Sequence, residues 1–260
     1  MSARRVTSLS NPAVKLARSL HLRKAREESG LFLAEGLRLI GEGLAAGRAP
    51  RLLIRGPQSG NHPILAAAEA RAAETLETSE AALAKISKKD NPQAALGVFE
   101  QSFVPLASLD PGSADCWLAL QGVRDPGNLG TIIRTLDAAG LSAVILIGET
   151  CDPFSVEAVR ATMGSIFAVQ IARTGLAEFL SWRAAWTGSV VGASLAGTTA
   201  LDPFGLARPI LLVMGSERAG LSAELAGACE QLVKIPMRGR ADSLNLAVAS
   251  GILLYRFTGA

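Results

Sequence analysis

The second half of the chain alternates short, strongly apolar segments with helical patterns, and this alternation constrains the fold more than any other feature. The apolar segments are residues 116–120, 143–147, 166–171, 190–193, 210–214 and 232–235. Helical patterns separate most of them, and the last helix is expected from about residue 243 to residue 257. Strands that are apolar on both faces and separated by helices are typical of a parallel sheet covered on both sides. We therefore predict an α/β fold, with a mostly parallel sheet and helices on both of its faces.

The N-terminal part of the chain repeats this alternation on a smaller scale. We expect strands at residues 31–34, 51–54 and 95–99, and helices at residues 11–27, 37–46, 63–73 and 80–86. Asn11 followed by Pro12 is a helix start, because Asn caps free N–H groups and Pro fits the first turn. Gly30 ends the helical run. This pattern predicts a separate, small α/β domain.

A change of composition separates the two parts. Residues 102–113 contain two prolines, one glycine and three serines, which is typical of a linker. Neither internal repeats nor low-complexity tracts are visible on either side of it. We therefore divide the chain into a domain at residues 1–101, a linker at residues 102–113 and a second domain at residues 114–260.

Basic residues are concentrated at the N-terminus. The chain has a net charge of +3, yet its first 26 residues hold seven Lys and Arg and no Asp or Glu. These cations are Arg4, Arg5, Lys15, Arg18, Arg23, Lys24 and Arg26. Five of them fall on the single helix that we predict at residues 11–27. A polyanion that docks there would explain the asymmetry, and so would a solvated helix face that serves solubility.

Cysteine spacing and hydropathy exclude other classes of protein. The three cysteines, Cys116, Cys151 and Cys229, are far apart, and the two histidines lie near none of them. We therefore expect no metal site and no disulfide. The N-terminus lacks the apolar core of a secretion signal, and no apolar stretch is long enough to span a membrane. These features predict a cytoplasmic protein without a membrane partner.

The phosphate-binding loops that many doubly wound sheets use are missing. Gly41 and Gly43 follow a helical stretch instead of a strand, and no Gly-Lys-Ser or Gly-Lys-Thr occurs. If the sheet binds a cofactor, the sequence therefore favours one without a phosphate group. S-adenosylmethionine has this property.

The segment that follows the first strand of the second domain, residues 121–134, combines a turn with a helix start. Asn128 is placed to cap this helix. At about 100° per residue, Arg134 lies opposite the middle of the apolar stripe that includes Ile133 and Leu136, so it points away from the sheet. A solvated arginine and a routine helix cap would explain these two residues equally well.

Two further segments follow strands whose carboxyl ends share the sheet edge where such folds bind ligands. The fifth strand runs into Gly215, which allows close backbone approach, and Glu217 is the one acid at its end. The last helix is apolar nearly all round, and its polar residues Asp242, Ser243 and Asn245 lie at its start. An Asn in the first turn of so apolar a helix needs a partner. Plain turn chemistry at Glu217 and a helix cap at Ser243 are the alternatives.

Together these three segments resemble the three motifs of the SpoU/TrmH family of RNA ribose methyltransferases. The matching stretches are Asp-Pro-Gly-Asn-Leu-Gly with a downstream Arg, then Gly-x-Glu-x-x-Gly-Leu-Ser, then Ile-Pro-Met-x-Gly with Ser-Leu-Asn. Their order and spacing agree over roughly Trp117 to Tyr255. In the N-terminal domain, Asn-Pro-x-Val-Lys and Gly-Leu-Phe-Leu-Ala-Glu-Gly look like the family's substrate-binding domain, which is similar to a small ribosomal-protein fold. One departure is Ser216, where many members carry Asn.

The resemblance implies transfer of a methyl group from S-adenosylmethionine to a ribose 2′-hydroxyl of ribosomal or transfer RNA. It also implies a C-terminal trefoil knot and a homodimer packed through the knotted region, and it makes the seven N-terminal cations candidate RNA contacts. The implied cofactor-binding residues are Ala193, Ser194, Leu195, Gly215, Ile235, Met237 and Leu244. The implied catalytic residues are Arg134, Asn128, Glu217, Ser243 and Asn245.

The resemblance assigns activation of the hydroxyl to Arg134, but an arginine stays protonated in proteins. We therefore expect Arg134 to hold the adjacent phosphate or the developing alkoxide. Asn128, Ser243 and Asn245 would orient the ribose and Arg134, and Glu217 would support them. Whether Arg134 serves its own subunit or the partner is open at this stage.

Two other functions fit a chain of this kind. A non-catalytic RNA-binding or ribosome-assembly module on the same fold predicts the loss of polar motif residues, and none is lost. A dinucleotide-dependent oxidoreductase needs a glycine fingerprint that is missing. The sequence leaves open which RNA is modified, at which nucleotide, and whether the base matters.

Overall fold

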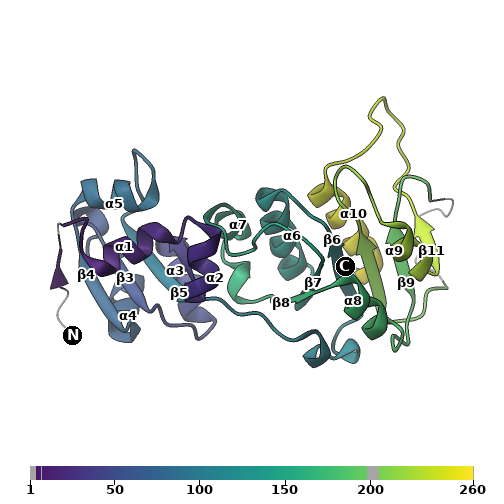
Figure 1. Cartoon of the computed structure of the whole chain (residues 1–260), viewed down its shortest axis with the longest axis horizontal. Helices are drawn as coiled ribbons and strands as arrows, with labels where there is room; N and C mark the ends of the chain where they lie inside the picture. Colours follow the sequence, from purple (N-terminus) through teal and green to yellow (C-terminus); the bar gives the residue numbers. More distant parts are fainter. Residues whose placement is uncertain (1–3, 7, 198–204, 260) are drawn as a thin grey trace. The chain divides into compact units, whose positions relative to one another are not determined.

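The computed structural model of the chain forms two compact units (Figure 1). The structure describes residues 4–6, 8–197 and 205–259. The first unit comprises residues 1–101 and 152–167, and the second comprises residues 102–151 and 168–260. Residues 152–167, which we predicted to belong to the second domain, thus fold with the first unit. None of the helices among the described residues has the length and apolarity needed to cross a membrane.

In the described part of the first unit, five strands form one mixed sheet. In spatial order they are β1 (Arg4–Arg5), β4 (Glu74–Glu77), β3 (Leu52–Arg55), β5 (Ala95–Glu100) and β2 (Leu31–Glu35). The helices are α1 (Pro12–Ser19), α2 (Arg23–Ser29), α3 (Leu37–Ala45), α4 (Pro63–Arg71), α5 (Glu80–Ser87) and α7 (Val156–Thr162). On β3, Leu52 and Ile54 enter one core while Leu53 enters another, so both faces of the sheet are covered.

The single helix expected at residues 11–27 is two helices, α1 and α2. Asn11 caps α1 and Gly30 ends α2 in the left-handed conformation, as predicted. Two side-chain contacts hold the break between them: His21 Nε2 lies 2.7 Å from the carbonyl oxygen of Ile86, outside the segment, and Arg26 Nη1 donates to the carbonyl oxygen of Leu20, within it. Burial lowers the pKa of His21, which favours its neutral ring beside this carbonyl. A helical pattern cannot register such tertiary bonds.

Strand β4 was not predicted, because it carries almost none of the apolar pattern of a strand. Of its four residues only Leu76 is buried. It forms because its backbone pairs in parallel with β3 on one side and with the short β1 on the other. This pairing places Arg4 and Arg5 at the edge of the sheet.

The described part of the second unit contains a six-stranded sheet in which every pair is parallel, as predicted. In spatial order the strands are β11 (Gln231–Val233), β9 (Val190–Ala193), β10 (Ile210–Met214), β6 (Cys116–Gln121), β7 (Ala143–Ile147) and β8 (Gln170–Thr174). The helices are α6 (Pro126–Ala138), α8 (Leu176–Arg183), α9 (Ala223–Ala228) and α10 (Leu246–Thr258). Phe179 of α8 and Leu225 of α9 enter a core on one face, while α6 and α10 pack against each other over the other face (Figure 1).

Three features of the second half of the chain differ from the expectation. Residues 165–167 form a short 3-10 helix within the first unit, so the strand expected at residues 166–171 begins only at Gln170. The last helix begins at Leu246 instead of residue 243. In the segment that we predict to be a linker, Leu106 and Leu109 are buried in the core of the second unit. The trefoil knot stays a prediction.

Candidate active site

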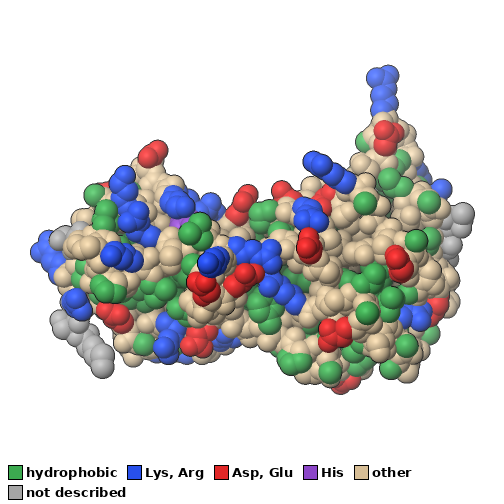
Figure 2. Space-filling view, in the orientation of Figure 1, with side chains coloured by type: hydrophobic (Ala, Val, Ile, Leu, Met, Phe, Trp, Pro, Cys, Tyr) green, Lys and Arg blue, Asp and Glu red, His purple; other side chains and the backbone are tan. Residues whose placement is uncertain are grey.

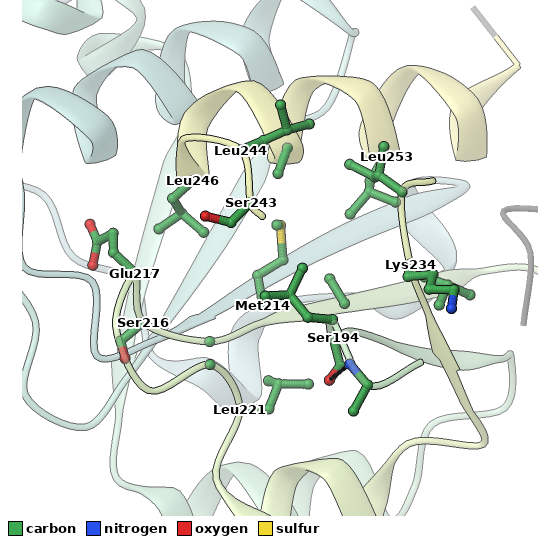
Figure 3. Close-up of a pocket in the computed structure, with 18 of the residues that line it drawn as sticks. Ser194, Met214, Ser216, Glu217, Leu221, Lys234, Ser243, Leu244, Leu246 and Leu253 are labelled. Atoms are coloured by element: carbon green, nitrogen blue, oxygen red, sulfur yellow. Dashed lines mark hydrogen bonds between the residues drawn. The ribbon is translucent and has the colours of Figure 1, made fainter. Parts of the chain in front are cut away.

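Strands β6 and β10 are neighbours, and they pair in register up to their carboxyl ends, where Leu120 lies opposite Met214. The loops that follow them carry the first two motifs and therefore leave the sheet side by side. The start of α10 carries part of the third motif, and Figure 3 shows Ser243, Leu244 and Leu246 on one side of a cavity whose opposite side holds Ser194 and Leu221. The fold thus brings the three segments to one edge of the sheet.

Side chains from all three motifs form a hydrogen-bonded network at this edge. Asn128 Nδ2 donates to Glu217 Oε1 over 3.1 Å, and Asn245 Nδ2 donates to Asn128 Oδ1 over 2.9 Å. The backbone N–H of Arg124 donates to Glu217 Oε2 over 3.4 Å. Both carboxylate oxygens of Glu217 are therefore occupied, and Asn128 is held between an acceptor and a donor.

The helix caps differ from those predicted, and the difference explains the network. Asp125, not Asn128, caps α6: its Oδ1 accepts from the backbone N–H of Asn128 at 2.6 Å. The side chain of Asn128 is thereby released to face Glu217. Asn245, not Ser243, caps α10, because its Oδ1 accepts from Ala247 N and its Nδ2 stays available for Asn128.

Arg134 is exposed on α6, on the side away from Ile132, Ile133 and Leu136, which are buried as predicted. Within the described residues, no hydrogen bond or ion pair joins it to Asn128, and it lies six residues further along the helix, about 9 Å by helix rise. The structure therefore does not bring Arg134 into the network that joins the other motif residues.

A cavity of about 370 Å³ opens between the loops that follow β9, β10 and β11 and the start of α10 (Figure 3). All seven residues expected to bind the cofactor line it: Ala193, Ser194, Leu195, Gly215, Ile235, Met237 and Leu244. Apart from Glu217, Arg218 and Lys234, the described lining residues are uncharged. Glu217 and Lys234 lie at opposite ends of the cavity in Figure 3.

This lining fits S-adenosylmethionine better than a phosphorylated cofactor. The lining includes apolar side chains and exposed loop backbone, which suit an adenosine and a thioether chain. It lacks the cluster of cations and the glycine-rich helix start that cradle phosphates. Sequence reasoning missed Leu221, Lys234 and Leu253 in this lining, although Leu221 belongs to the second motif and Lys234 precedes the third.

The loop after β10 is shaped by one glycine. A Cβ atom at Gly215 would lie 1.9 Å from the backbone carbon of Gly220, so no larger residue fits there. Ser216 and Gly220 bond to each other through both backbone N–H groups, which closes the loop into a tight turn. The close backbone approach predicted at Gly215 is confirmed.

The N-terminal cations divide into exposed and buried groups. Arg26 is only 3% exposed, and its Nε lies 2.7 Å from Oδ2 of Asp152 in a buried ion pair. The prediction that Arg26 contacts RNA is therefore wrong, because its guanidinium is committed to a carboxylate 126 residues away in the sequence. Arg23 pairs with Glu27 on the surface of α2. The other six candidates are exposed.

Helix α5 adds cations that sequence reasoning missed. It packs against α1, and its C-terminal end exposes Lys85 and Lys88. Figure 2 shows Lys and Arg side chains gathered over this part of the first unit. Lys85 and Lys88 are far from the N-terminal cations in the sequence, so the charge pattern did not predict that they belong to the same surface.

Two of the three cysteines, Cys116 and Cys229, are poor nucleophiles. Burial raises the pKa of Cys116 to about 12 and that of Cys229 to about 11, so both thiols stay protonated at neutral pH. Among the described residues, no group of three or more His, Cys, Asp or Glu is arranged to hold a metal ion.

Comparison with known proteins matches residues 115–255 to the SpoU rRNA methylase family and residues 11–97 to the MRM3-like substrate binding domain. A 23S rRNA (guanosine(2553)-2′-O)-methyltransferase of Bacillus subtilis is 32% identical over 98% of this chain and 100% of its own length. A 23S rRNA (uridine(2479)-2′-O)-methyltransferase of Streptomyces viridochromogenes is 30% identical over 98% of this chain and 91% of its own length.

Solved structures agree with these matches over both units. The crystal structure of an AdoMet-bound rRNA methyltransferase from Sinorhizobium meliloti is 47% identical to this chain, with a TM-score of 0.89 over 98% of this chain and 97% of that one. The SpoU methyltransferase AviRb of Streptomyces viridochromogenes, in complex with AdoMet, is 28% identical with a TM-score of 0.81. The chain belongs to the SpoU rRNA methylase family.

Proposed function

We propose that this chain transfers the methyl group of S-adenosylmethionine to a ribose 2′-hydroxyl of 23S ribosomal RNA in the cytoplasm. As a member of this family it is an S-adenosylmethionine-dependent RNA methyltransferase. The proposal adds the substrate RNA and the roles of individual residues. One observation carries those roles: Glu217 lines the cofactor cavity and also accepts a hydrogen bond from Asn128, so the polar network borders the cavity.

The relatives support 23S rRNA as the substrate, but they do not identify the nucleotide that is methylated. The Bacillus and Streptomyces proteins act on 23S rRNA, one at a guanosine and the other at a uridine. Similar chains thus modify different bases, which suggests that base identity is set outside the shared motifs. The non-catalytic alternative is disfavoured, because a pure RNA-binding module has no use for a cofactor cavity bordered by an intact network.

When bound in the cavity, S-adenosylmethionine supplies a methyl group on a sulfonium centre. Its bound form would allow methyl transfer to the ribose 2′-oxygen, with S-adenosylhomocysteine as the leaving group and the hydroxyl proton passing to solvent. The loops around Gly215 and Ile235 hold the cofactor, and positioning contributes roughly 7–11 kcal/mol at best to lowering the barrier. Asn128 and Asn245 orient the ribose, and Ser243 faces the same cavity.

Glu217 acts in this scheme as a support. Its two oxygens accept N–H groups from Asn128 and Arg124, so it fixes the network. Arg134 stabilises the developing alkoxide or the adjacent phosphate with its guanidinium.

Methylation of an unmodified 23S rRNA transcript tests the proposal. With methyl-labelled S-adenosylmethionine we expect label in the RNA at one ribose, mapped as a bond that resists alkaline cleavage. An RNA with 2′-deoxyribose at that nucleotide should give no product, because the acceptor oxygen is gone. Product on the deoxy substrate would establish base methylation instead. A protein that binds S-adenosylhomocysteine and RNA but transfers no methyl to any ribosomal RNA would contradict the proposal.

Replacing Arg18, Arg23 and Lys24 by alanine is expected to weaken binding of ribosomal RNA. Each phosphate contact that is lost removes a counterion-release contribution, so the salt dependence of the affinity should also become shallower. Affinity for S-adenosylmethionine should stay unchanged, because those residues belong to the other unit. Filter-binding titrations at several salt concentrations decide the matter. Unchanged affinity and slope would mean that these cations form only a solvated face.

We further propose that the enzyme is a homodimer that buries one face of α10. Val248, Ile252 and Tyr255 are exposed although apolar, and their spacing puts them on one side of the helix, while Leu244, just before the helix, is exposed as well. Val248 is 51% exposed, which is unusual for an unpartnered apolar stripe on a soluble protein. The Val248→Asp/Ile252→Asp double variant should shift sedimentation from dimer to monomer. Sedimentation of the wild-type chain as a monomer would contradict this proposal.

A further inference from the structure

A second hollow shares a wall with the cofactor cavity. Its volume is about 940 Å³, and it is lined by the loop after β6, residues 121–126, and by the loop after β10, residues 216–222. Residues 216–221 line both this hollow and the cofactor cavity. One tight loop therefore separates the two spaces.

The two loops are fastened to each other, so the hollow is a built surface. Gln121 Nε2 lies 3.1 Å from Ser222 Oγ, and the backbone N–H of Ser222 donates to Gln121 Oε1 over 2.8 Å. Gly122 adopts a positive φ of 64°, and a Cβ atom there would touch Cβ of Ser216. Glu217 adds a third connection, to the backbone N–H of Arg124.

The charged groups of the hollow differ in what they are free to bind. Asp125 caps α6 and Glu217 has both oxygens occupied, so the two acids hold the loops in place. Arg124 pairs with Glu149 only at 3.8 Å, with side chains that are 72% and 91% exposed, and such surface pairs are weak. Arg218 is exposed on the opposite loop. The guanidinium groups are thus the donors left to meet an anion.

We propose that this hollow binds the RNA strand next to the methylated nucleotide, with Arg124 and Arg218 donating to its phosphate groups. The inference rests on the proposed function, since the acceptor ribose must reach the cofactor cavity from an adjoining site. Guanidinium groups bind phosphate oxygens in a two-pronged geometry, and two of them on facing loops suit a strand that passes between. The shared loop then places that strand beside the wall that carries Glu217.

The test is RNA binding by Arg124→Ala and Arg124→Glu variants of the full chain, measured with a 23S rRNA transcript at several salt concentrations. Loss of one phosphate contact should raise Kd roughly tenfold for the alanine variant and reduce the salt slope by about 1. The glutamate variant should bind more weakly still. Calorimetry should show unchanged affinity for S-adenosylmethionine, because Arg124 does not line the cofactor cavity.

Arg208→Ala is the matched control. Arg208 is a partly exposed arginine that pairs with Asp115, just before the amino end of β10, and its loss should leave RNA affinity within about twofold. Arg218→Ala should weaken RNA binding as Arg124→Ala does. Binding of the transcript by Arg124→Glu as tightly as by the wild type would overturn the inference. RNA binding is measured here without methyl transfer. A wild-type chain that binds RNA but transfers no methyl group would therefore contradict the proposed function and leave this inference standing.

Discussion

Replacing Arg134 by alanine is expected to lower kcat for methyl transfer by about 10²- to 10³-fold, the usual effect of removing a donor that stabilises developing charge. Affinity for S-adenosylmethionine should be unchanged, because Arg134 does not line the cofactor cavity. Folding should be unaffected within about 0.5 kcal/mol, since the side chain is exposed. Arg134→Lys should fail as well if a two-pronged guanidinium is required. The measurements are single-turnover methylation of the rRNA transcript and calorimetry.

Thr131→Ala is the control, since Thr131 is exposed on the same helix three residues earlier and carries no charge. Near-normal turnover in Arg134→Ala would remove Arg134 from the mechanism, and near-normal turnover in Arg134→Lys alone would indicate a plain charge effect. The separation of Arg134 from the network of Asn128 and Glu217 leads us to propose that it acts in the partner's site. Mixing Arg134→Ala chains with cavity-blocked Ala193→Trp chains should then restore part of the activity, whereas action within one chain would restore none.

Replacing Arg26 by methionine is expected to destabilise the first unit by about 3–5 kcal/mol, because it leaves the buried carboxylate of Asp152 without its cation. The guanidinium also donates to the carbonyl oxygen of Leu20, so the turn between α1 and α2 loses a bond. Methionine preserves the apolar length of the side chain, which limits the packing loss. Urea denaturation followed by circular dichroism gives the free energy of unfolding.

Arg23→Ala provides the comparison, because Arg23 forms an exposed pair with Glu27 and its loss should cost less than about 1 kcal/mol. If Arg26→Met unfolds at the same urea concentration as Arg23→Ala, the buried pair does not stabilise the fold. An Arg26→Met/Asp152→Asn double variant should recover part of the loss, since the uncompensated charge is removed.

The polarity of short segments was enough to predict the parallel sheet of the second unit. Strands such as β7 and β10 are buried at every position, so their composition alone identifies them. The same kind of reasoning failed for β4, in which only Leu76 is buried and whose pairing depends on β3 and β1. An edge strand that is held by its neighbours carries little local pattern.

Through the resemblance, the motifs named seven residues that all line one cavity, because loops after parallel strands meet at one edge of the sheet. They left two roles for Asn128 open, a helix cap and a member of the polar network, and the structure places it in the hydrogen-bonded network. A cap and a network member look alike in sequence, and only the position of Asp125 three residues earlier decided between them.

The sequence by itself determined the fold class and most elements of the parallel sheet, since these depend on local polarity, and the resemblance to the family supplied seven residues that line the cavity. Only the tertiary structure decided that residues 152–167 fold with the first unit, that Arg26 is buried against Asp152, and that Glu217 and Asn245 both bond to Asn128. Local patterns record whether a side chain is turned toward a core or toward solvent. They do not record which distant residue meets it there, and that choice is made when elements far apart in the chain pack together.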